Sequence, residues 1–168
     1  MIEIIDLPYE MVISYYDVKI GPIVLTRFGI DIPEKGIDIP ENQITNLMEF
    51  HTDGETFSHC YVQHDKLFSL NHCFAIKGNK ARGGCHDLMI SVLFKKKNNI
   101  SIREYLNTIL DNIELLELWI EGISEQIYEE KCINSILKSQ KAGSLYNNDD
   151  IKRSLIGCLN RNSLYNII

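Results

Sequence analysis

The stretch YYDVKIGPIVLTRF, residues 15–28, predicts a β-hairpin near the start of the chain. Four residues in its middle favour a tight turn: Asp17, Lys19, Gly21 and Pro22. Glycine adopts a positive φ at no steric cost, and proline has a fixed φ and no N–H to donate. The flanks, MVISYY and IVLTRF, are β-branched and aromatic, as strands prefer. We therefore expect strands over residues 11–18 and 22–30.

Apolar periodicity and breaker residues divide the rest of the chain into a few further elements. The expected elements are a brief extended lead-in over 2–5, a helix over 40–51, strands over 57–63, 66–76 and 86–94, helical sequence over 101–140 and a short helix over 149–159. The last strand contains LMISVLF, an almost continuous apolar run that indicates a central strand buried on both faces. The first helix and the later helices should then cover opposite faces of one sheet.

The helical sequence over 101–140 has the clearest local signals in the chain. Ser101 and Glu104 form a capping box at its start. Apolar residues then recur at steps of three and four, and an acidic stripe of Asp111, Glu114, Glu117, Glu121, Glu125 and Glu129 runs beside them. Gly122 and Ser124 predict a break into helices over 101–121 and 124–140, whereas the unbroken phase of the apolar repeat favours one helix.

The element order, ββαβββαα with an added short C-terminal helix, indicates an α+β fold. Its sheet should be five-stranded and antiparallel, with helices on both faces. This order resembles the longin domains of the roadblock/longin superfamily, a profilin-like architecture. The turn residues Asp17, Lys19, Gly21 and Pro22 resemble the start of longin domains in DENN and folliculin-like proteins. The resemblance implies the strand order 2-1-5-4-3 and one domain over 1–168, with a core over 10–140 and a C-terminal extension over 141–168.

Longin-like domains bind proteins, so the resemblance implies a non-enzymatic interaction module. It implies a regulator or scaffold for small GTPases or vesicle-trafficking complexes, often as a homo- or heterodimer with another longin or roadblock protein. The family provides no catalytic, cofactor or metal residues to transfer to this chain. The element order carries most of the resemblance, and the opening hairpin supplies no chemistry.

Composition narrows the classes of function further. The 168 residues include 23 acidic and 17 basic ones, a net charge of −6, which argues against nucleic-acid binding. No apolar run approaches the ~20 residues of a membrane span. The N-terminal sequence MIEIIDLPYEM lacks the basic start of a secretion signal. An odd number of cysteines without framework spacing predicts free thiols and a cytoplasmic protein.

A window over residues 51–86 holds the main candidates for metal or small-molecule sensing, the alternative function. It contains His51, His59, His64, His72, His86, Cys60, Cys73 and Cys85. Three adjacent His/Cys pairs occur there, but neighbouring residues on a strand point to opposite faces, so no pair chelates as a unit. Ligands from two neighbouring strands remain open as a zinc site. Buried cysteines and strand-end histidines are the favoured interpretation, and a Cys/His nucleophile ranks below the metal.

Four residues are candidates for a partner interface. Lys80 and Arg82 lie in the basic, glycine-rich loop KGNKARGG, which fails the Walker pattern at Gly84 and Cys85. Anion contact through this loop is the alternative to a solvated turn. Leu118 and Trp119 lie off the main apolar stripe of the long helix, so they either widen the core face or form an exposed patch. The acidic stripe is either a solvated face or a docking surface for a basic partner.

Overall fold

The fold is built on one five-stranded antiparallel sheet in the order β2-β1-β5-β4-β3. A computed structural model describes residues 2–17, 19–30, 41–52, 59–64, 66–77, 84–129, 145 and 148–167. The strands are β1 Tyr9–Asp17, β2 Gly21–Ile30, β3 His59–His64, β4 Leu67–Lys77 and β5 Cys85–Lys95. The α-helices are α1 Glu41–Thr52, α2 Ile102–Asp111, α3 Ile113–Glu129 and α5 Asp149–Arg161. The predicted strand order and α+β class are confirmed.

The turn between β1 and β2 is organised by Asp17. Its Oδ1 atom accepts hydrogen bonds from the backbone N–H groups of Lys19, at 2.8 Å, and Ile20, at 3.1 Å. Gly21 has a φ of 91°, the left-handed conformation that glycine adopts without strain. The hairpin ladder then runs from Asp17 opposite Gly21 to Tyr9 opposite Ile30, with one irregularity after Ile13. The turn predicted at these residues and the positive φ expected of Gly21 are therefore confirmed, and the two Asp17 hydrogen bonds are a feature that the structure adds.

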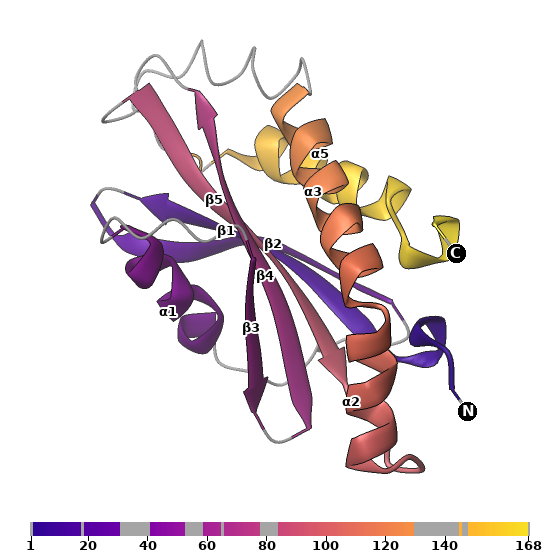
Figure 1. Cartoon of the computed structure of the whole chain (residues 1–168). Helices are drawn as coiled ribbons and strands as arrows, with labels where there is room; N and C mark the ends of the chain where they lie inside the picture. The colour runs from indigo at the N-terminus through magenta and orange to yellow at the C-terminus, as the bar shows by residue number, and fades with distance from the viewer. Residues whose placement is uncertain are drawn as a thin grey trace.

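Helices cover both faces of the sheet, as the apolar run of β5 predicts (Figure 1). On one face, Ile44 and Met48 of α1 pack against a small cluster that includes Val12, Met89 and Leu93. On the other face, α2, α3 and α5 close a much larger core, which draws residues from every strand except β3. Residues 88–94 of β5 are all fully buried, so this central strand separates the two cores.

The predicted break in the long helical segment is wrong in position. Helix α2 starts as expected, with the Ser101 hydroxyl accepting a 3.1 Å hydrogen bond from the Glu104 N–H. The interruption comes at Asn112, whose side chain donates to the Thr108 carbonyl at 2.8 Å and whose N–H bonds to Ile109 at 3.1 Å. A short polar side chain that competes for backbone carbonyls interrupts the helix here. Gly122 and Ser124 lie inside α3, and residues 130–144 are outside the described part.

Both ends of the described chain close the larger core. The lead-in forms a 3-10 helix, η1 Ile4–Asp6, where we expected an extended piece; Asp6 accepts from the Glu3 N–H at 2.8 Å and so favours the turn. Helix α5 packs against β2 and α3, and a second 3-10 helix, η3 Leu164–Asn166, follows it. The hydroxyl of Tyr9 accepts the Leu164 N–H at 2.9 Å, which joins the first strand to the C-terminal segment.

Candidate functional site: the face of α3 and the strands beside it

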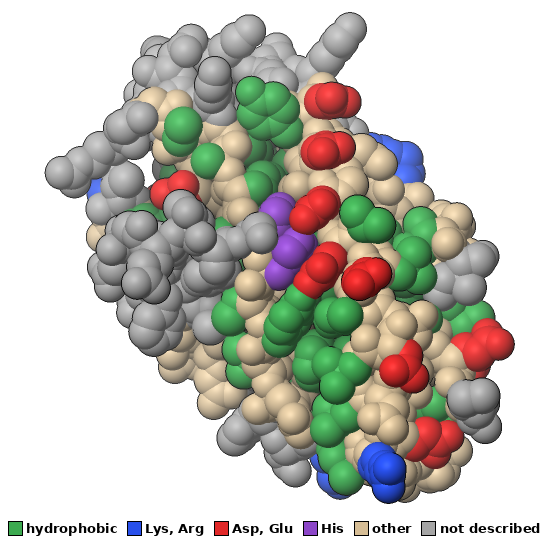
Figure 2. Space-filling view, viewed as in Figure 1, with side chains coloured by type: hydrophobic (Ala, Val, Ile, Leu, Met, Phe, Trp, Pro, Cys, Tyr) green, Lys and Arg blue, Asp and Glu red, His purple; other side chains and the backbone are tan. Residues whose placement is uncertain are grey.

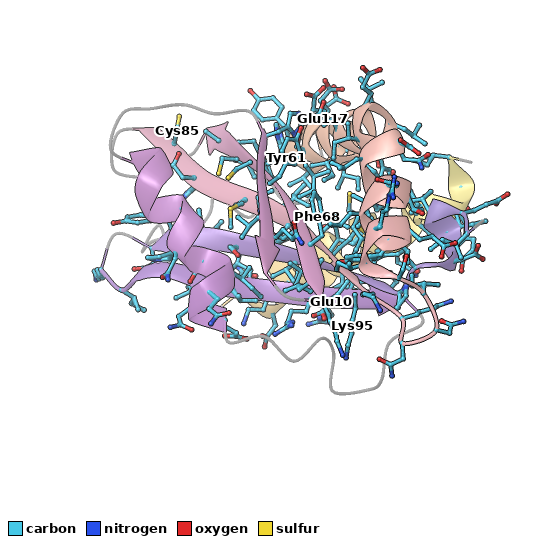
Figure 3. The ribbon with its side chains drawn as sticks, turned by 60° about the horizontal axis from the view of Figure 1, so that its bottom comes forward. Glu10, Tyr61, Phe68, Cys85, Lys95 and Glu117 are labelled. Atoms are coloured by element: carbon cyan, nitrogen blue, oxygen red, sulfur yellow. The ribbon has the colours of Figure 1, made fainter. Side chains whose placement is uncertain are left out.

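An aromatic row covers β3 and β4 on the side that faces α3. His59 lies opposite His72 in the strand register, and their rings stack with centroids 4.9 Å apart. The His72 ring continues onto Phe74 at 6.1 Å, and Tyr61 stacks on Phe68 at 6.3 Å. Figure 3 shows Tyr61 and Phe68 on the strands beside α3, which carries Glu117. The edge strand β3 thus brings aromatic surface next to the long helix.

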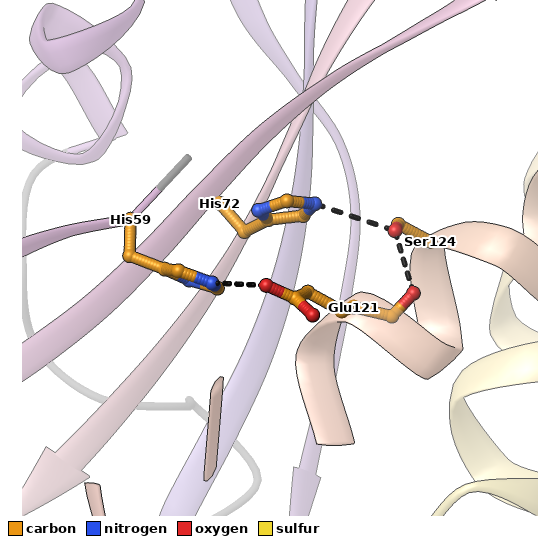
Figure 4. Close-up of polar contacts among 4 residues, drawn as sticks. All are labelled: His59, His72, Glu121 and Ser124. Atoms are coloured by element: carbon orange, nitrogen blue, oxygen red, sulfur yellow. Dashed lines mark hydrogen bonds and ion pairs between the residues drawn. The ribbon is translucent and has the colours of Figure 1, made fainter. Parts of the chain in front are cut away.

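Two hydrogen bonds join this aromatic row to α3 (Figure 4). Nε2 of His59 lies 2.7 Å from Oε1 of Glu121, and Nε2 of His72 lies 3.3 Å from Oγ of Ser124. The Ser124 hydroxyl donates to the Glu121 carbonyl at 2.7 Å. Because its proton is used there, His72 is the donor toward Ser124. These contacts fix α3 against the sheet edge, a link that sequence spacing does not reveal.

The cluster does not have the arrangement of a hydrolase. A serine nucleophile must donate its proton to a base, whereas Ser124 donates to a backbone carbonyl and is 7 % exposed. The Glu121 carboxylate contacts Nε2 of His59, while the Ser124 hydroxyl contacts Nε2 of His72. The residues therefore make a structural clamp between β3, β4 and α3, without an activated nucleophile.

The His72/Cys73 pair splits across the sheet as the strand geometry predicts. His72 faces α3, and Cys73 packs in the small core beneath α1. Burial raises the pKa of Cys73 to about 12 and raises the pKa of Cys60, so neither supplies a thiolate near neutral pH. Within the residues that the structure describes, no three His, Cys, Asp or Glu side chains converge as a metal site.

The remaining histidines of the window are His86, His51 and His64. His86 is buried, with Nδ1 3.4 Å from the Tyr15 hydroxyl. Burial lowers its pKa, against an opposing effect of Asp87. His51 and His64 lie on α1 and β3, with side chains outside the described part of the molecule.

Leu118 and Trp119 have opposite environments although they are neighbours on α3. Trp119 is 6 % exposed, donates from Nε1 to the Asn162 carbonyl at 2.7 Å, and meets the Tyr9 ring edge-on at 5.8 Å. The burial of Trp119 favours a role in the core over a role in an exposed patch. Leu118 is 68 % exposed, the highest value among the large apolar residues described.

Leu118 lies in the acidic face of α3. On a helix, residues three and four positions apart are neighbours, so Glu114 and Glu121 flank Leu118, and Glu125 continues the row. Figure 2 shows acidic side chains in a row along α3, with apolar side chains on either side. The helix Ile113–Glu129 contains no lysine or arginine.

Comparison with solved structures provides a fold-level relationship. The longin domain of Lst4 from K. lactis superimposes with a TM-score of 0.55 and 9 % identity, over 95 % of this chain and 98 % of that chain. The chain has a longin fold. No known protein family matches its sequence. No curated protein matches either.

In this longin fold α3 packs against β4, and its Glu121 contacts His59 on the edge strand β3. In the described part of this longin fold, no helix has the length and apolarity that a membrane crossing needs. Lys80 and Arg82, the other two candidate interface residues, lie outside the described residues. Leu118 is therefore the candidate interface residue that the structure places on an exposed surface.

Proposed function

We propose that this chain is a non-enzymatic interaction module of the cytoplasm that regulates or anchors small GTPases or vesicle-trafficking complexes. The observation that carries the proposal is the likeness to a longin domain across 95 % of the chain. Fold alone does not define function. The sites described above add support, because Ser124, Cys60 and Cys73 lack the geometry or ionisation of nucleophiles.

Two kinds of surface support a binding role. Strands β2 and β3 are the edges of the sheet, and a partner strand pairs with such an edge through backbone hydrogen bonds. On β3, Tyr61 and Val62 are 45 % and 38 % exposed. The exposed Leu118 on α3 is the second surface, and Lys80 and Arg82 are proposed as further contacts. A homo- or heterodimer would form through one of these surfaces.

Capture on the immobilised full chain tests this proposal. The panel consists of small GTPases of the same organism, each loaded with GDP or a GTP analogue, together with its longin and roadblock proteins. An acidic α+β protein of similar size is the control for nonspecific capture. We expect stoichiometric retention of at least one panel member. If none is retained and light scattering gives only a monomer, the proposal loses its support.

A further inference from the structure

The net charge of this protein is concentrated in one rod, α2 and α3. Residues 102–129 contain seven of the 23 acidic residues and one of the 17 basic residues, which gives this segment a charge of −6. The other 140 residues contain 16 of each kind and are neutral in sum. The whole net charge of −6 therefore lies on 28 residues, a strong local field for an oppositely charged partner.

The same rod carries apolar side chains that its own fold leaves exposed. Leu110, Leu115 and Leu118 are 52 %, 37 % and 68 % exposed. Exposed leucines contribute nothing to the solvation of an acidic helix. Protein interfaces, in contrast, combine a central apolar contact with a polar rim. Glu114 and Glu121 flank Leu118 in this arrangement.

A small hollow lies beside the C-terminal half of α3. Its volume is about 210 Å³. It lies between β4 and α3 and is lined by Phe74, Ala75, Ser124, Glu125, Tyr128 and Glu129. Aromatic and alkyl groups line the hollow together with two carboxylates. This combination matches an arginine or lysine side chain, whose stem is apolar and whose end is cationic.

We propose that the outer face of α3 binds a basic amphipathic helix of a protein partner. Leu118 would contact the apolar stripe of that helix, and a cationic side chain would enter the hollow at Tyr128. From Glu114 to Glu129 the face is about 22 Å long, and cations four residues apart on a partner helix match the spacing of the glutamates. An anionic membrane or a second copy of the same face would be repelled.

This inference deepens the proposed function. It rests on that function only for the expectation that the partner is a protein of a GTPase or trafficking complex. The probe is a fluorescent helical peptide of about 18 residues, about 27 Å long, with lysine and arginine on one face and leucine on the other. A scrambled peptide of the same composition is the control ligand. We measure anisotropy with the full chain at about 0.05 M and 0.5 M NaCl, and expect binding that weakens with salt.

Two variants probe the face itself. Leu118→Ala removes the apolar contact, and the triple change Glu114→Gln, Glu125→Gln and Glu129→Gln removes three charges that have no role in the His59 clamp. We expect each to weaken binding of the amphipathic peptide by about tenfold. Equal affinity of the variants and the wild type would overturn the proposal, as would equal affinity for the scrambled peptide.

Matched controls distinguish this face from general acidity. The triple variant Glu41→Gln, Asp149→Asn and Asp150→Asn removes the same charge from exposed positions on other helices. Ile20→Ala removes an apolar side chain that is 63 % exposed in the β1–β2 turn. Both controls should keep wild-type affinity within about twofold. Loss of binding in these controls, or binding to vesicles rich in anionic lipid, would overturn the proposal.

The failure of this inference and the failure of the proposed function have different signatures. If a panel GTPase or longin protein binds wild type and both α3 variants equally, the docking face is wrong and the proposed function stands. If no panel member binds but the amphipathic peptide binds in the way described, the face stands and the proposed function fails.

Discussion

Replacement of Trp119 by phenylalanine tests how the C-terminal helix is held. Trp119 is 6 % exposed, and its Nε1 atom donates to the Asn162 carbonyl at 2.7 Å, just after α5 ends at Arg161. Phenylalanine keeps an aromatic ring beside Tyr9 but has no N–H. A hydrogen bond contributes about 1 kcal/mol net, and the smaller ring leaves space in a dense core. We expect Trp119→Phe to lower the free energy of unfolding by about 2 kcal/mol.

Urea unfolding followed by circular dichroism measures this change, since the variant loses the fluorescence of the single tryptophan. Trp119→Ala should cost about 3–5 kcal/mol, because it also opens a cavity. Leu118→Ala is the matched control at the adjacent residue. Because Leu118 is 68 % exposed, we expect the free energy of unfolding to change by less than about 0.5 kcal/mol. A cost below about 0.5 kcal/mol for Trp119→Phe, or equal costs at the two positions, would show that the Trp119 hydrogen bond does not hold the C-terminal segment.

Three further changes test other parts of the structure. Arg27→Met should cost about 2 kcal/mol in urea unfolding, because it removes the guanidinium that pairs with the buried Glu10 carboxylate; an unchanged midpoint would contradict the pair. Ser91→Ala should keep or raise stability by about 1 kcal/mol, since the buried Ser91 hydroxyl has no hydrogen-bond partner among the described residues, and a clear loss would show one. His86 has a pKa lowered by burial from its ordinary 6.5, so the unfolded chain binds its proton first as the pH falls. The stability of the wild type should therefore decrease below pH 6.5 more steeply than that of His86→Gln, measured by thermal unfolding across pH; parallel curves would contradict this.

Local sequence signals predicted most of the architecture because they were strong where the backbone is constrained. The turn at Asp17–Gly21 was predicted from its residue types, and the positive φ of Gly21 is the conformation that glycine favours. The apolar run in β5 indicated a strand covered on both faces, and the structure buries it between two cores. Ser101 and Glu104 marked the start of α2 for the same kind of reason.

The predicted position of the helix break was wrong because several residues could interrupt the helix at nearly equal cost in free energy. Asn112 interrupts the helix through its own side-chain hydrogen bond, while the glycine at 122 is tolerated inside α3. Helix interiors accept one glycine at a cost of about 1 kcal/mol, which tertiary packing exceeds. A sequence therefore indicates that a break is near without showing which residue makes it.

The contents of the candidate site were less accessible than the fold. His59 and Glu121 are 62 residues apart in sequence, and only strand register and helix docking bring them within 2.7 Å. Both Leu118 and Trp119 are large and apolar, so their types did not show which one is buried. The rotation of α3 against the sheet buries Trp119 and exposes Leu118. The acidic stripe was visible in the sequence, whereas only the structure shows that Leu118 within this stripe is exposed to solvent.

Equilibrium binding of the folded full chain to the panel of small GTPases, longin and roadblock proteins tests the central claim most directly. We expect a saturable one-to-one complex with at least one panel member, and no complex with the acidic control protein. Absence of any such complex, with circular dichroism showing the chain to be folded, would contradict an interaction module of longin fold.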